Sequence, residues 1–312
     1  MDAPEPSRAW PVPPQLVEGK RGGLLAWLEC RLVLAAMGAV ARLPAGLRSA
    51  LVGLLARAGR RFDRPHSRAA EAFLLQALGR EMPREELARR VLQAWRHLIE
   101  VTLDFEIFDR RIDRARAAQH LDLELCAQAR ELIEKQQGCV LVAGHLGDWE
   151  TGAALLSSAG FGPVYVISKP PKNRYLARHA QRVRESRGMR LLPRRGAMEF
   201  APAVVRGGGT LAMLLAQRAR LKPVLAPFFG RESKCDRSAS VLLRRLRVPL
   251  GFAACYRTQN PLRYRLVVPR VVQPEEVAGK SAEEVATLVN SELEKLILAA
   301  PEQYFWLHDR WR

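Results

Sequence analysis

The spacing of apolar residues divides the chain into two parts with different periodicities. In the first third, apolar residues recur every three or four positions, as on one face of an α-helix. Pro44, Pro65 and Pro83 lie close to expected helix starts, where proline is well tolerated. The pattern predicts helices over residues 24–42, 45–60, 68–78 and 84 to about 108.

From residue 139 onward, short runs of small and β-branched residues alternate with helical runs. Strands are predicted over residues 139–144, 163–168, 189–192, 210–215, 225–228, 248–256 and 263–268. Helices are predicted between or after them over residues 149–158, 173–187, 197–206, 238–246 and 281–300. Such alternation favours a single α/β domain with a mainly parallel central sheet flanked by helices.

The expected organisation has three parts. Residues 1–20 form a proline-rich, flexible N-terminus that has no secretory signal pattern. Residues 21–110 form a helical region that is expected to associate with a membrane, and residues 111–312 form the α/β domain. Within the helical region, residues 24–40 are rich in Leu, Ala and Val, but Glu29 and Arg31 interrupt them. Because of these charges we do not expect a spanning helix, which leaves an interfacial helix or a core helix.

The overall charge suggests an acidic partner. The 312 residues include 50 Lys plus Arg against 32 Asp plus Glu, which gives a formal net charge of +18. Such a charge attracts nucleic acid, anionic lipid or an acidic carrier protein, and the chain has no nucleic-acid-binding motif. The five cysteines are odd in number and lack metal-ligand spacing, so we expect reduced thiols in the cytoplasm.

The candidate chemistry centres on His145. This histidine follows a predicted strand, at the end where open α/β sheets bind ligands. Glu150 lies five residues later and is expected to orient one ring nitrogen, while Asp148 is either a rival partner or the cap of the next helix. The chain has no Gly-x-Ser-x-Gly elbow, so the hydroxyl that His145 activates is expected to belong to a substrate.

Three further segments are candidates for binding or packing. The block from Lys169 to Arg195 is rich in basic residues, and one face of its helix is expected to bind phosphate while another packs or faces solvent. The sequence Pro227-Phe228-Phe229-Gly230 suits an apolar slot or an ordinary core. The aromatic C-terminal stretch should pack back on the fold, with Trp306 and Trp311 as anchors.

In this order, the motifs resemble those of the bacterial lipid A late acyltransferases (lauroyl- and myristoyltransferases). The wider group includes lysophospholipid and phosphatidylinositol mannoside acyltransferases. The matching elements are His145 to Glu150, Ser168-Lys169-Pro170 with Asn173, Arg187-Gly188, residues 227–230 and residues 301–311. Lys169 stands where the family has Arg, and Ala216-Gln217 stands where many members have Asp-Gln.

The resemblance implies a glycerolipid acyltransferase-like fold and a membrane-associated O-acyltransferase. His145 and Glu150 would be the catalytic pair, acting on an acyl thioester and a hydroxyl of a lipid A precursor. Substrate-binding residues would be Lys169, Asn173, Arg184, Arg187, Gln217, Phe228 and Phe229. The implied partners are acyl carrier protein or acyl-CoA, a glycolipid acceptor and the cytoplasmic face of the bacterial inner membrane. No metal or cofactor is expected, since the thioester is a co-substrate.

Three alternatives remain open from the sequence. The acceptor could be another glycolipid or a lysophospholipid, because Ala216 and Lys169 differ from the residues that the family usually has at these positions. The protein could instead be a non-catalytic binder of anionic membranes or nucleic acid, which would leave the His145–Glu150 pair without a role. A serine-type hydrolase is the weakest option because no nucleophile lies on an elbow.

Overall fold

The structure is a computed structural model of the chain. It describes residues 11–13, 19–79, 81–112, 114–194, 196–220, 222–261 and 263–311. Most of the predicted proline-rich N-terminus, and Arg195 at the end of the basic block, lie outside the described residues.

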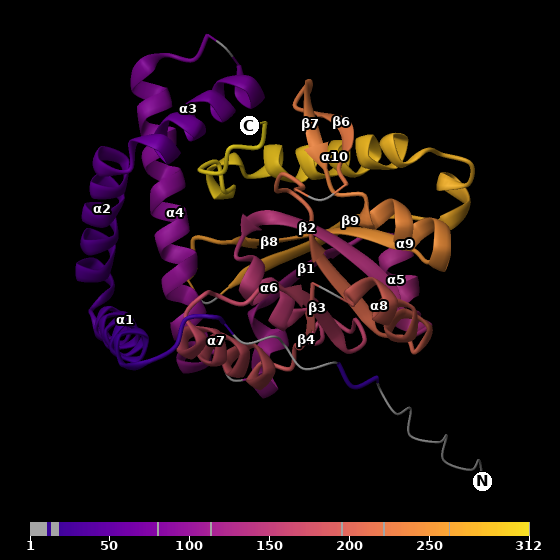
Figure 1. The fold of residues 1–312 in the computed structure, drawn as a ribbon, viewed down its shortest axis with the longest axis horizontal. Helices are drawn as coiled ribbons and strands as arrows, with labels where there is room; N and C mark the ends of the chain where they lie inside the picture. Colours follow the sequence, from indigo (N-terminus) through magenta and orange to yellow (C-terminus); the bar gives the residue numbers. More distant parts are fainter. Residues whose placement is uncertain are drawn as a thin grey trace.

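A seven-stranded, mostly parallel sheet forms the centre of the fold (Figure 1). Its strands are β1 (Leu121–Leu125), β2 (Cys139–Gly147), β3 (Val164–Ser168), β4 (Arg190–Pro193), β5 (Thr210–Leu214), β8 (Leu250–Arg257) and β9 (Tyr264–Val272). They lie in the order β1-β9-β8-β2-β5-β3-β4, and only β8 and β9 pair antiparallel. The predicted fold class is confirmed. The predicted strand at 225–228 is present as β6 (Val224–Phe228), which lies outside the central sheet and pairs with β7 (Arg231–Cys235) in a separate hairpin.

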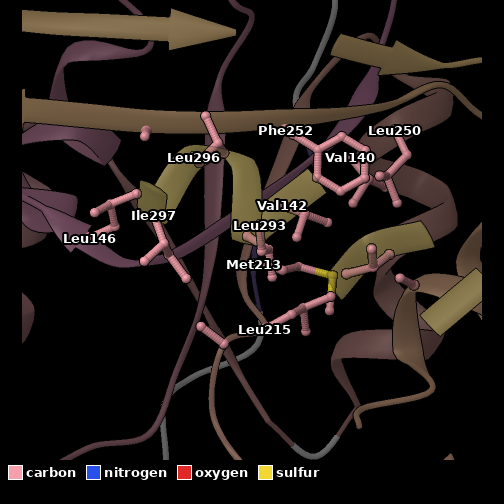
Figure 2. Close-up of a cluster of buried hydrophobic side chains, with 14 of the residues drawn as sticks. Val140, Val142, Leu146, Met213, Leu215, Leu250, Phe252, Leu293, Leu296 and Ile297 are labelled. Atoms are coloured by element: carbon pink, nitrogen blue, oxygen red, sulfur yellow. The ribbon is translucent and has the colours of Figure 1, made fainter. Parts of the chain in front are cut away.

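Helices cover both faces of this sheet. They are α5 (Ala127–Glu134), α6 (Trp149–Leu155), α7 (Arg174–Ser186), α8 (Ala197–Arg206), α9 (Ser238–Leu246) and α10 (Ala282–Ala299), with short 3₁₀ turns at Arg114–His120, Pro274–Val277 and Pro301–Gln303. Because side chains alternate along a strand, β2 contributes to two apolar layers. Val140 and Val142 pack in the layer that contains Leu293 of α10, as Figure 2 shows, whereas Cys139 and Leu141 belong to the other layer.

The N-terminal helices pack together on one side of the sheet (Figure 1). They are α1 (Leu24–Arg42), α2 (Ala45–Phe62), α3 (Arg64–Leu78) and α4 (Arg84–Arg111). Among the described residues, α1 is the one helix long and apolar enough to cross a membrane by length and composition. Only Ala26 and Cys30 of α1 are buried, so the core-helix alternative does not describe it.

The N-terminal helices and the α/β part share one apolar core around Phe73 of α3. The Phe73 ring makes edge contacts with Phe228, Phe229, Tyr304, Trp306 and Trp311. These rings come from β6, the turn after it and the C-terminal stretch. The predicted packing of the C-terminus on the fold is therefore confirmed, and the predicted boundary at residue 110 stays a prediction.

Candidate active site

The candidate active site lies at the carboxyl end of β2. The pairing of β2 with β8 is interrupted between Ala143 and Gly147, which frees the segment that carries His145 from regular strand geometry. Gly147 then turns the chain with a φ of 60°, and a Cβ atom there would lie 2.0 Å from the Cys255 carbonyl oxygen. Only glycine fits this turn, which leads directly into α6.

Gln217 meets His145 across the sheet edge. It follows the end of β5, the parallel neighbour of β2, and parallel neighbours bring their carboxyl ends together. The side-chain Nε2 of Gln217 lies 3.3 Å from Nε2 of His145. The structure thus places the amide of Gln217 beside the ring nitrogen that faces outward from the strand end.

The C-terminal stretch holds both of these segments. The Phe305 N–H donates to the His145 carbonyl at 3.0 Å, and Tyr304 forms an antiparallel bridge with Leu146. On the Gln217 side, the buried Arg310 donates to the Gln217 carbonyl oxygen. The tail therefore fixes the backbone on each side of the His145–Gln217 contact.

Glu150 contacts Arg184 of α7 rather than His145. The Arg184 guanidinium donates to both carboxylate oxygens, with Nε 2.9 Å from Oε2 and Nη2 2.6 Å from Oε1. Nδ1 of His145 is buried and has no hydrogen-bond partner among the described residues. The expected direct hydrogen bond between Glu150 and His145 is thus not formed. Glu150 acts on the imidazole through its charge, which partly opposes the lowering of the His145 pKa by burial.

Asp148 is the cap of α6, the second of the two roles expected for it. Its carboxylate accepts from the Thr151 N–H at 3.0 Å and from the Thr151 hydroxyl at 2.8 Å. Burial, reinforced by the nearby charge of Asp104, raises the pKa of Asp148 to about 6. The two hydrogen bonds to Thr151 fix the first turn of α6.

His145 is neutral at physiological pH. Burial, followed by the charge of His308, lowers its pKa to about 4, and the charge of Glu150 partly opposes them. The ring also packs against Trp149 and Phe305, with centroids 5.2 and 6.0 Å away. An imidazole that is already deprotonated can accept a proton from a hydroxyl group.

A second buried histidine, His97 of α4, makes the fold sensitive to acid. Burial, followed by the charge of Arg257, lowers the His97 pKa to about 3. Between pH 6.5 and 3 the unfolded chain therefore binds a proton that the folded chain does not, so this group reduces stability as pH falls.

We predict that His97→Gln reduces this acid sensitivity. At pH 4.5 the histidine contributes a loss of about 3 kcal/mol relative to pH 7, from the two pH units below its ordinary pKa. Urea denaturation at the two pH values measures the difference. His66→Gln, at an exposed histidine, is the matched control. Equal pH dependence in wild type and His97→Gln would contradict the prediction.

Three further residues of the predicted site are Lys169, Asn173 and Arg187. Lys169 is exposed, whereas Asn173 is buried and caps α7 while donating to the Ala26 carbonyl at 2.8 Å. Arg187 is also buried, and its guanidinium donates to the Phe105 carbonyl and stacks on the Phe105 ring. Asn173 and Arg187 thus make contacts between helices in the structure, and the substrate-binding roles expected for them and for Lys169 stay predictions.

Phe228 and Phe229 belong to the aromatic cluster around Phe73. Phe228 is fully buried, and the Arg310 guanidinium lies 5.1 Å from the centre of its ring. Phe229 has a positive φ of 47° and its N–H donates to Glu294 at 2.7 Å. Of the two readings of this motif, the structure shows the core, and a role in lining an acyl channel stays a prediction.

Sequence reasoning missed the contributions of Phe305, His308 and Arg310 to the site. His308 accepts the Arg218 N–H at 3.1 Å, just beyond Gln217. The signal was present, because these residues belong to the C-terminal motif that was noted for its aromatic content. Among the residues that the structure describes, no group of three or more His, Cys, Asp or Glu side chains is arranged to hold a metal ion.

Comparison with known proteins agrees with this arrangement. The family of bacterial lipid A biosynthesis acyltransferases matches residues 23–312, which is nearly the whole chain and includes all four N-terminal helices. No curated protein gives a significant match. Since the match includes the strand end with His145, the Gln217 segment and the C-terminal stretch, the chain belongs to the bacterial lipid A biosynthesis acyltransferase family.

Proposed function

We propose that this acyltransferase moves a fatty acyl chain from a thioester donor to a hydroxyl of a lipid A precursor, with His145 as general base. The observation that carries the proposal is the neutral His145 imidazole at the end of β2, with Nε2 next to the Gln217 amide. Acyl carrier protein and coenzyme A are the two candidate carriers. The thioester already activates the carbonyl, so the proposed reaction needs no cofactor.

The proposed reaction has two steps. Nε2 of His145 takes the proton of the acceptor hydroxyl as its oxygen bonds to the thioester carbonyl carbon, which gives a tetrahedral oxyanion. The carbonyl re-forms as the carbon–sulfur bond breaks, and the thiolate leaves with the proton from the imidazolium. The charge of Glu150 favours the imidazolium between these steps, and Arg184 holds that carboxylate in place.

Gln217 is proposed to donate a hydrogen bond to the oxyanion. Its Nε2 lies 3.3 Å from the base, and the oxyanion is bonded to the same carbon as the attacking oxygen, so it forms close to this amide. We predict that Gln217→Met, which keeps the side-chain length and removes the donor, lowers kcat about 10²–10³-fold. Steady-state kinetics with a labelled donor measures this, and Gln137→Met at an exposed position is the control. A kcat within about two-fold of wild type would remove Gln217 from the mechanism.

The membrane is proposed to meet the protein at α1. The helix packs along α4 and α7, and α7 carries arginines on several faces. A spanning α1 would draw these arginines into hydrocarbon at a cost of roughly 2.5–3.5 kcal/mol each at the centre. We therefore propose that α1 lies on the bilayer, with the chain bound peripherally to the cytoplasmic face of the inner membrane.

A second acceptor class is favoured by one observation. Ala216, where many family members have Asp, is buried and lies beside the β2 strand end, close to Gly144. A substitution so near His145 changes the surroundings of the acceptor, so another glycolipid or a lysophospholipid is the alternative acceptor.

One assay tests the proposed function and separates the acceptors. Acyl carrier protein and coenzyme A, each loaded with a labelled long acyl chain, are incubated with the protein and an extracted bacterial lipid pool. The products are identified by mass. Acylated lipid A precursor is the expected product. Acylation of a different lipid selects the second class, and no transfer with every donor and acceptor would support the non-catalytic alternative.

A further inference from the structure

A groove of about 700 Å³ separates α1 from α7, away from the aromatic cluster and the tail. Figure 1 shows the two helices side by side. The groove is lined by Trp27, Arg31 and Leu34 of α1 and by Tyr175, Arg178 and Arg182 of α7. It combines aromatic and apolar side chains with three guanidinium groups, and the mechanism proposed above uses none of them.

The two helices are joined at one end of the groove. Asn173 at the start of α7 donates to the Ala26 carbonyl at 2.8 Å. The backbones also pair, with the Arg21 N–H donating to the Lys172 carbonyl at 2.9 Å and the Arg174 N–H to the Arg21 carbonyl at 3.0 Å. These bonds hold the walls at a fixed separation, so the groove is part of the fold.

The charge of the groove favours an anion. Burial raises the pKa of the Cys30 thiol, and the charges of Arg31 and Arg182 oppose this rise more than Glu29 and Glu106 add to it, which places guanidinium groups from each helix beside the same buried residue. Glu185 is the acidic side chain in the lining, and its carboxylate accepts from Gln181 at 2.8 Å. His179, which also lines the groove, faces Glu106 of α4 at 2.9 Å. Arginine binds phosphate oxygens in pairs, so three guanidiniums against one lining carboxylate suit a phosphate group.

The surface next to the groove is apolar. At 100° per residue, Leu24, Leu25, Leu28 and Leu32 lie on the side of α1 that adjoins the groove residues. Their exposed fractions are 71, 83, 41 and 70%. Trp27, which lines the groove, is 44% exposed, and tryptophan is enriched at the level of lipid headgroups.

We propose that the α1–α7 groove binds the phosphate of an anionic phospholipid in the bilayer on which α1 rests. With the leucines in the acyl-chain region, the groove arginines lie at the level of the headgroups. The site deepens the proposed membrane association and is separate from the acyl-transfer chemistry at His145. It would set the depth and orientation of the enzyme on the membrane.

The test measures binding of the full chain to sedimented vesicles of phosphatidylcholine with or without phosphatidylglycerol. Arg178→Gln/Arg182→Gln is expected to weaken binding to phosphatidylglycerol vesicles roughly 30-fold, as two surface arginines would in the field of an anionic leaflet. Glu185→Gln should strengthen it several-fold. The control is Arg130→Gln/Arg206→Gln, with the same charge change on α5 and α8, which lie across the molecule from α1 (Figure 1). Thermal unfolding checks that each variant is folded.

Each outcome has a distinct meaning. Selective loss in the groove variant supports the site. Equal loss in the control would show a general charge effect and overturn it, as would binding that both variants leave unchanged. Unchanged vesicle binding with weaker transfer from acyl carrier protein would assign the groove to the acidic carrier protein instead. Failure of the proposed function is seen separately, as absent acyl transfer by wild type.

Discussion

Replacing His145 with alanine is expected to lower kcat for acyl transfer about 10²–10⁴-fold, the usual contribution of a positioned general base. The imidazole is neutral at physiological pH and lies at the strand end beside Gln217. The substitution therefore removes the group that is proposed to take the proton from the acceptor hydroxyl. Single-turnover transfer from a labelled thioester measures the loss. His66→Ala, which removes an exposed histidine of α3, is the matched control.

The same assay on Glu150→Gln separates two ways in which the carboxylate can act. In the structure Glu150 is bound by Arg184 and reaches His145 only through its charge, so a smaller loss than that of His145→Ala is expected. A loss equal to that of His145→Ala would show that the direct hydrogen bond predicted from the sequence forms when substrate is bound. Wild-type rates in His145→Ala would refute the general base itself.

Replacing Phe73 with alanine is expected to reduce the free energy of unfolding by about 3–5 kcal/mol, as is typical of a buried Phe→Ala change. The ring is 1% exposed and contacts five other aromatic rings, the nearest being Trp311 with centroids 4.5 Å apart. Because Tyr304 in this cluster also bridges to Leu146, next to His145, we expect kcat to fall as well.

Urea denaturation with kinetics on the same samples measures both effects of Phe73→Ala. Phe62→Ala, at a phenylalanine of α2 that is 80% exposed, should stay within about 0.5 kcal/mol of wild type. A loss as small in Phe73→Ala would mean that the α3 contact with the tail does not stabilise the fold.

The elements that the sequence predicted best are those with strong periodicity. The bounds of α1, α8 and α9 agree with the predicted ranges, and every predicted strand is present. The strands β1 and β7 and the helix α5 were missed. β7 has a single apolar residue, Cys235, and forms by pairing with β6 rather than from a pattern of its own. β1 does alternate Leu with Asp and Glu, a strand pattern that was overlooked because it is only five residues long.

The candidate site was also predicted only in part from the sequence. The place of His145 follows from local pattern, because an apolar run followed by Gly-His and a turn must end a buried strand. The partner of Glu150 does not follow from local pattern, because its separation of five residues from His145 does not determine where the Glu150 side chain points. Arg184, on a helix 34 residues later, offers two hydrogen bonds to the carboxylate and takes it away from the imidazole.

By itself, the sequence determined the fold class, the strand end that presents His145 and the family motifs, because each of these depends on residues close together in the chain. The tertiary structure decided which groups meet there. It placed Gln217 beside the base, the C-terminal tail behind it and Arg184 on Glu150, since these contacts join segments distant in sequence through sheet order and packing. It also decided that α1 exposes its leucines beside a basic groove, because only the packing of α1 on α4 and α7 determines which side of that helix remains uncovered.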